Sequence, residues 1–127
     1  MVKVTIIADG WIQGSGYRTF VKQVASQLGL KGLVRNLSNG EVEIFCEGEL
    51  PRINKLLKMI NYKRQKHDVL SVYVESLTVH KEGEKDYQGS WKHYVQFEID
   101  YGFEVESPVD RTLLECLEKR LLLLASL

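Results

Sequence analysis

Two segments with helical periodicity alternate with short segments of strand-like sequence, and this order restricts the fold to a layered architecture. Apolar residues recur every three to four positions from Tyr17 to Leu28 and again from Ile53 to Ile60, as on one face of a helix. Short β-branched or alternating runs surround them, at Val2–Ala8, Leu33–Leu37, Val42–Glu47, Val69–Val79 and Tyr94–Tyr101. The predicted order is therefore strand, helix, strand, strand, helix, strand, with one further strand at the end.

The turn residues agree with this order. Asn39-Gly40 between two extended runs is a strong hairpin signal, Gly29 suits a helix end, and Pro51 suits a first helical turn. A change of phase within Val69–Val79 suggests a bulge, and Phe45 interrupts an otherwise polar strand face, so we expect something to cover it. The economical packing is an α+β, ferredoxin-like βαββαβ sandwich, with a mainly antiparallel sheet and two helices on one face.

Composition excludes several classes of protein. The 127 residues carry 17 basic and 17 acidic side chains, so we expect neither nucleic acid nor membrane as a partner. The two cysteines, Cys46 and Cys116, have no metal-binding spacing, and His67, His80 and His93 show none, so no metal and no cofactor are expected. The first residues lack the pattern of a signal peptide, which favours a cytoplasmic protein.

The neutral total conceals two charged segments. Six basic residues and no acidic ones lie between Pro51 and Lys66, whereas seven acidic residues and one basic one lie between Glu98 and Glu118. The basic run is read first as the solvated face of a helix. Contact with the acidic segment and binding of an anionic partner such as RNA are the alternatives, although only Tyr62 offers the aromatic stacking that single-strand binding uses.

The last segment, residues 102–127, is expected to form a helical extension of a domain spanning residues 1–101. Ser107-Pro108 resembles a helix start, and a stripe of apolar residues follows: Val109, Leu113, Leu114, Leu117, Leu121 and Leu124. Such a stripe needs a partner surface. We expect it to cover its own sheet, in a monomer; the alternative is a homodimer through the C-terminal helix.

The glycine-rich segment Gly10–Arg18 is the first candidate site. Its glycines allow successive backbone N–H groups to point into one concavity, and the helix that follows adds its positive end. Arg18 supplies a planar cation suited to a phosphoryl group. The segment is neither a Walker A sequence nor a dinucleotide fingerprint. The plainer interpretation is a tight turn with a surface arginine.

The second candidate is Asn36, which stands at the end of a predicted strand just before the Asn39-Gly40 hairpin. An asparagine in such a place often bonds only its own turn. From composition alone, both interpretations stay open.

Together, the two segments resemble the signatures of the acylphosphatase family. The family's first signature, G-x-V-Q-G-V-x-F-R, corresponds to Gly10–Arg18, with Ile12, Ser15 and Tyr17 as replacements. Its second, G-W-V-x-N-x-x-D/N-G, corresponds to Gly32–Gly40, with Leu33 in place of tryptophan. Its closing strand, F-x-I-x-Y, reads Phe97–Tyr101. The resemblance spans about residues 1–101.

The resemblance implies metal-independent hydrolysis of the carboxyl–phosphate bond of a small-molecule acyl phosphate. It places the catalytic roles on Arg18 and Asn36. It places phosphate binding on the backbone of Gln13, Gly14, Ser15, Gly16, Tyr17 and Arg18. Arg18 would neutralise charge on the phosphoryl group, and Asn36 would orient a water molecule.

Two other functions are alternatives. One is a non-catalytic acylphosphatase-like binding or regulatory module that uses the C-terminal helix for partner or self-association. The other is a carbamoyl-phosphate-handling domain of hydrogenase maturation proteins, which is disfavoured because this chain is short and lacks zinc-binding cysteine pairs.

Overall fold

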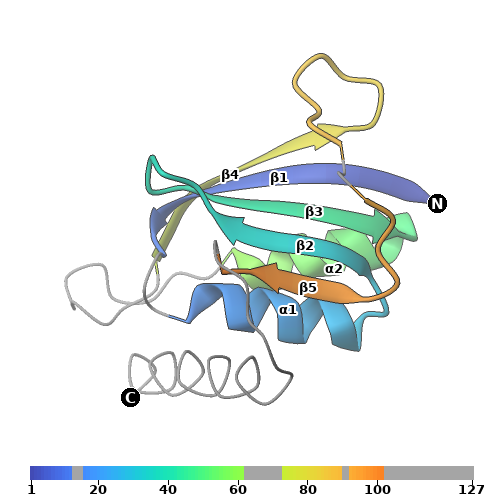
Figure 1. Cartoon of the computed structure of the whole chain (residues 1–127), viewed down its shortest axis with the longest axis horizontal. Coiled ribbons are helices and arrows are strands. Elements are labelled where there is room, and N and C mark those ends of the chain that lie inside the picture. Colours follow the sequence, from blue (N-terminus) through green and yellow to red (C-terminus); the bar gives the residue numbers. More distant parts are fainter. Residues whose placement is uncertain (13–15, 62–72, 90–91, 102–127) are drawn as a thin grey trace.

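The computed structural model of the chain describes residues 1–12, 16–61, 73–89 and 92–101 (Figure 1). Seven elements follow one another in these residues. They are β1 (Val2–Trp11), α1 (Tyr17–Gln27), β2 (Lys31–Asn36), β3 (Val42–Gly48), α2 (Leu50–Ile60), β4 (Tyr73–Lys81) and β5 (Phe97–Asp100). The predicted order of elements is confirmed, with boundaries that differ by a few residues.

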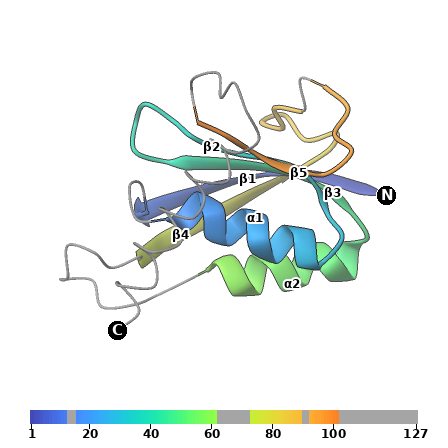
Figure 2. The same ribbon diagram turned by 60° about the horizontal axis from the view of Figure 1, so that its bottom comes forward.

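The strands form one sheet in the order β4-β1-β3-β2-β5, and both helices lie against the same face of it (Figures 1 and 2). β1 pairs antiparallel with β3 and β4, and β3 pairs antiparallel with β2. β5 runs parallel to β2 at the sheet edge, with Arg35 opposite Asp100. The ferredoxin-like sandwich is therefore confirmed, and the parallel pair brings the ends of β2 and β5 together.

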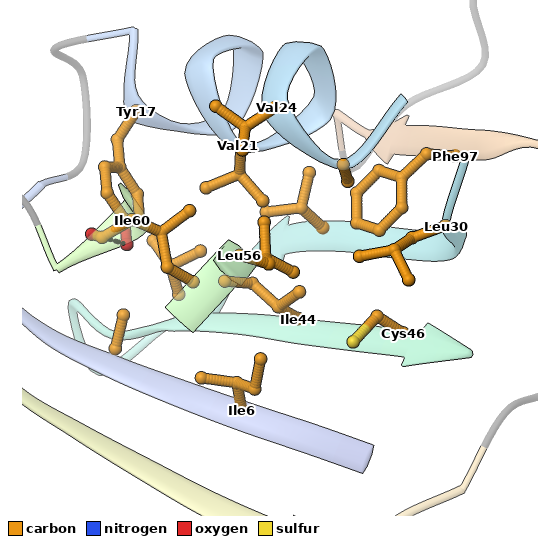
Figure 3. Close-up of a cluster of buried hydrophobic side chains, with 14 of the residues drawn as sticks. Ile6, Tyr17, Val21, Val24, Leu30, Ile44, Cys46, Leu56, Ile60 and Phe97 are labelled. Carbon is orange, nitrogen blue, oxygen red and sulfur yellow. Dashed lines mark hydrogen bonds between the residues drawn. The ribbon is translucent and has the colours of Figure 1, made fainter. Parts of the chain in front are cut away.

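The core lies between the helices and the sheet (Figure 3). Alternate residues of the strands pack against the apolar faces of α1 and α2. The side chains from the strands and from the two helices are almost fully buried: Val4, Ile6, Val34, Ile44 and Phe97, with Val21 and Leu56. One polar group is built into this core, because the Tyr17 hydroxyl donates a buried hydrogen bond of 2.8 Å to the Ile60 carbonyl. That bond ties the start of α1 to the end of α2.

The last strand is shorter than predicted. The alternating run begins at Tyr94, but the strand begins at Phe97, after the Gly32 amide donates to the Gln96 carbonyl. Tyr94 lies on the sheet face opposite the helices, where alternation along the run also places it, and its ring centre is 5.8 Å from that of Phe45. This contact covers Phe45, as expected.

The bulge expected within Val69–Val79 is confirmed in the described part of that run. Asp9 is opposite Ser76 and Gly10 is opposite Val74, so Glu75 is the additional residue. Gly10 has a φ of 144°, and a Cβ there would collide with the Tyr73 carbonyl. Only glycine therefore allows the two strands to approach so closely at the point where β1 leads into the glycine-rich segment.

The basic run is confirmed as a solvated helix face as far as the structure describes it. Arg52, Lys55 and Lys58 are exposed on α2, and Arg52 donates to the Leu28 carbonyl. The rest of the run and the expected C-terminal helix, residues 102–127, lie outside the described residues. In the described ranges, no helix has the length and apolar character that crossing a membrane requires.

The buried thiol of Cys46 predicts a loss of stability at alkaline pH. Burial raises the pKa of Cys46 to about 12, whereas an exposed cysteine has a pKa of about 8.5. Burial also raises the pKa of Tyr17. The folded state keeps these protons while the unfolded state loses them, so the contribution is complete below pH 8.5 and is lost as the pH rises toward 12.

We therefore expect the free energy of unfolding to fall by about 1.4 kcal/mol per pH unit above pH 8.5 from the thiol alone. Urea denaturation at pH 7.5, 9 and 10 measures this slope. Cys46→Ala should flatten the slope between pH 8.5 and 10, although the variant is less stable overall because of the cavity. An unchanged slope in that variant would show that the thiol does not cause the loss.

Candidate active site

The start of α1 carries the first catalytic candidate. Gly16 precedes the helix with φ 87° and ψ 9°, a left-handed conformation that glycine adopts without strain. This turn directs the chain from the edge of the glycine-rich segment into α1. The first N–H groups of a helix have no acceptor within the helix, and its N-terminus carries partial positive charge. Arg18 is the second residue of α1 and therefore adds its full charge to that end.

Two groups at the end of β5 contact the Arg18 side chain. Its Nη1 donates a hydrogen bond of 3.2 Å to the Asp100 carbonyl, and its guanidinium carbon lies 5.0 Å from the centre of the Tyr101 ring. Arg18 is half-buried. The guanidinium is therefore held against the end of β5, and Arg18 stays partly at the surface.

Asn36 lies at the same end of the sheet. It is the last residue of β2, and the residue before it, Arg35, is opposite Asp100 in the parallel pair. In Figure 1 the arrowheads of β2 and β5 and the first turn of α1 all lie toward one end of the molecule. Side chains alternate along a strand, and Val34 is buried beneath the helices, so Asn36 is on the helix-facing side as well.

The Asn36 side chain offers a hydrogen-bond acceptor. Its Oδ1 is buried and has no hydrogen-bond partner among the residues that the structure describes. A buried acceptor without a donor costs about 1–3 kcal/mol. This oxygen lies at the end of the sheet that holds Arg18. It could therefore accept a hydrogen bond from a ligand or a water molecule bound there.

The adjacent hairpin does not need Asn36. Asn39 provides the turn, because its Oδ1 accepts a 3.0 Å hydrogen bond from the Glu41 amide, and Gly40 takes a φ of 93°. The Leu37 amide closes the hairpin on the Glu41 carbonyl. The alternative role for Asn36, bonding its own turn, therefore belongs to Asn39.

The predicted phosphate-binding residues divide into two groups. Gln13, Gly14 and Ser15 lie outside the described residues. Gly16, Tyr17 and Arg18 are described, and all three lie at the N-terminal end of α1. The Tyr17 side chain points into the core toward Ile60 and not toward the helix end (Figure 3), so only its backbone N–H could contact a phosphate.

Sequence reasoning missed the contacts of Asp100 and Tyr101 with Arg18. The alternation of the last strand places Tyr101 on the core side with Phe97 and Ile99, and this was the available signal. Nothing in the local pattern relates residues 100 and 101 to residue 18, since the contact depends on the pairing of β5 with β2.

Comparison with known proteins agrees with this geometry. The family model for Acylphosphatase matches residues 4–88. A curated acylphosphatase from Caldivirga maquilingensis is 42% identical over 89 residues, which cover 69% of this chain and 90% of that protein. One from Chlorobaculum tepidum is 36% identical over 77 residues, 61% of this chain and 84% of that protein.

The solved structures give the same result. The crystal structure of acylphosphatase from Bacillus subtilis superimposes with a TM-score of 0.62 at 28% identity, over 80% of this chain and all of that one. The family match, residues 4–88, spans both candidate segments. The chain belongs to the acylphosphatase family.

Proposed function

We propose that this enzyme hydrolyses the carboxyl–phosphate bond of small-molecule acyl phosphates, giving a carboxylate and inorganic phosphate. Membership of the family supports the reaction. The observation that supports the assignment of residues is the location of Arg18 against the end of β5 and of Asn36 at the neighbouring end of β2, where the buried Asn36 oxygen lacks a partner among described residues.

In the proposed binding step, backbone N–H groups of Gln13 to Arg18 hold the phosphate oxygens. The positive end of α1 supports this assignment, because N–H groups at a helix start bind anions. The Arg18 guanidinium offers two parallel N–H donors to the transferring group and reduces its negative charge in the transition state. Positioning and charge stabilisation are the main requirements of phosphoryl transfer.

In the proposed chemical step, the Asn36 carbonyl accepts a hydrogen bond from a water molecule and aligns it with the leaving oxygen. The water oxygen forms a bond to phosphorus as the bond from phosphorus to the acyl oxygen breaks. The bonding electron pair leaves with the carboxylate. An amide is no base near neutral pH, so a phosphate oxygen of the substrate takes the proton of the water.

Phosphate release from benzoyl phosphate tests the proposal. We expect the full-length chain to release phosphate without added metal, at a rate that a chelator does not change, since Arg18 and the amides supply the positive charge. A rate equal to the spontaneous hydrolysis of benzoyl phosphate would contradict the proposed enzyme. If inorganic phosphate still bound, the result would favour the alternative, a non-catalytic binding module.

We propose further that residues 1–101 are the catalytic domain of a cytoplasmic protein and that residues 102–127 are a helical extension covering the domain's own sheet. The free, buried thiol of Cys46 supports a reducing compartment. Deleting residues 102–127 tests the extension. Loss of solubility or folding supports a structural cover, whereas an active monomer from a dimeric parent would assign the extension to self-association instead.

A further inference from the structure

The Arg18 side chain needs support to act as the proposed function requires. A free arginine side chain loses rotamer entropy when it is held in one conformation. A catalytic guanidinium that is already oriented avoids that loss when substrate binds. In this chain, groups at the end of β5 contact it.

The two contacts at the end of β5 differ in kind. The Asp100 carbonyl accepts from Nη1 at 3.2 Å and fixes one point of the guanidinium. The Tyr101 ring, at 5.0 Å from the guanidinium carbon, contacts it through a cation–π interaction that restricts the plane of the group. Both partners are uncharged, so neither cancels the positive charge. The carbonyl belongs to the backbone, and the ring is the contribution of a particular side chain.

The place of Tyr101 in the sheet fits this role. Tyr101 follows Asp100, and Asn36 follows Arg35, which is paired with Asp100. Tyr101 and Asn36 therefore stand at equivalent positions on neighbouring strand ends, about 5 Å apart in the direction of pairing. Tyr101 is half-buried and packs against the core beneath α1. The ring is thus held by the same strand end that neighbours the water-orienting candidate.

We propose that Tyr101 is a positioning residue for the hydrolysis: its ring fixes the Arg18 guanidinium in the orientation that meets the transferring phosphoryl group. This inference rests on the proposed function. It assigns to Tyr101 no contact with the substrate and no proton transfer. The ring is required and the hydroxyl is not, which gives the proposal a specific test.

The test compares Tyr101→Leu with Tyr101→Phe in the full-length chain. With benzoyl phosphate, Tyr101→Leu should lower kcat/KM about tenfold, within the range of a partly desolvated cation–π contact, mainly through kcat. It should also weaken competitive inhibition by inorganic phosphate. Tyr101→Phe keeps the ring and should restore both values to within about twofold of the parent.

Two further variants separate positioning from general damage. Tyr94→Leu makes the same substitution on the opposite face of the sheet, where the ring contacts Phe45, and should lower stability without changing inhibition by phosphate. In an Arg18→Ala background, Tyr101→Leu should cause no further loss of phosphate affinity, measured by calorimetry with inorganic phosphate, because its effect passes through Arg18.

The outcomes are distinct. The proposal is overturned by parent-like kcat and phosphate inhibition in Tyr101→Leu, by equal damage in Tyr101→Phe, or by an equal loss of phosphate affinity with and without Arg18. If the parent chain binds phosphate but hydrolyses nothing, the proposed function fails, and the affinity cycle alone decides the role of Tyr101. If the parent neither hydrolyses benzoyl phosphate nor binds phosphate, both proposals fail.

Discussion

Replacing Arg18 by alanine is expected to lower the rate of phosphate release from benzoyl phosphate by at least about 10³-fold, the effect of removing an arginine that stabilises a phosphoryl transition state. The side chain is held at the end of β5 by the Asp100 carbonyl and the Tyr101 ring, and so it is in place before substrate arrives. Steady-state kinetics at several substrate concentrations would place most of the loss in kcat.

Arg35→Ala is the matched control for this experiment. Arg35 is also a half-buried arginine near the end of β2, but it pairs with Glu43 at 2.8 Å, and alternation along β2 puts it on the opposite face from Val34 and Asn36. We expect a small loss of stability and a parent-like rate. Arg18→Lys keeps the charge without the planar pair of donors and should be intermediate. A rate within tenfold of the parent in Arg18→Ala would exclude Arg18 as the catalytic cation.

Replacing Asn36 by alanine is expected to lower kcat by about 10²–10³-fold, as when one preorganised polar group of an active site is removed. The same variant should be as stable as the parent or more stable. The Asn36 oxygen accepts no hydrogen bond from any described residue, so its removal breaks none of the hydrogen bonds that hold the hairpin. Phosphate release and urea denaturation, measured on the same preparation, test both halves of this prediction.

Asn39→Ala is the matched control, for which we expect a loss of stability and no loss of activity. Asn39 closes the hairpin through the Glu41 amide and lies at an exposed turn. Its loss should lower stability by about 1 kcal/mol and leave the rate unchanged, since a lost capping-type hydrogen bond has about that effect. The contradicting outcome is an Asn36→Ala variant that is destabilised as much as Asn39→Ala and loses activity only in proportion to its unfolded fraction. Asn36 would then have a structural role, and it would not orient the proposed water molecule.

Most of the fold could be predicted from the sequence because local patterns carry it. Helical spacing in α1 and α2, alternation in β3, and the Asn39-Gly40 hairpin each correspond to an observed element. The break in the alternating pattern of Val69–Val79 also predicted a bulge, which the structure places at Glu75. A bulge adds one residue to a strand, and the added residue shifts the alternation of the sequence. These signals are short in range and need no knowledge of distant partners.

The start of β5 could not be predicted in the same way. Tyr94–Gln96 continue the alternation of β5, yet Val95, which the pattern places with Phe97, is 78% exposed. Its neighbour Tyr94 contacts Phe45, almost fifty positions earlier, and no local pattern relates these two residues. The sequence indicated that Phe45 needed a cover but not which residue would supply it.

For the site, the sequence alone determined which groups are available: a glycine-rich turn before a helix, an arginine in that helix's first turn, and an asparagine before a hairpin. The tertiary structure places these groups at one end of the sheet. Arg18 is bonded to a carbonyl 82 residues away, and Asn36 ends the strand that pairs in parallel with β5. No local pattern relates these residues, because strand pairing and the covering of the sheet by α1 join segments that lie far apart in the chain.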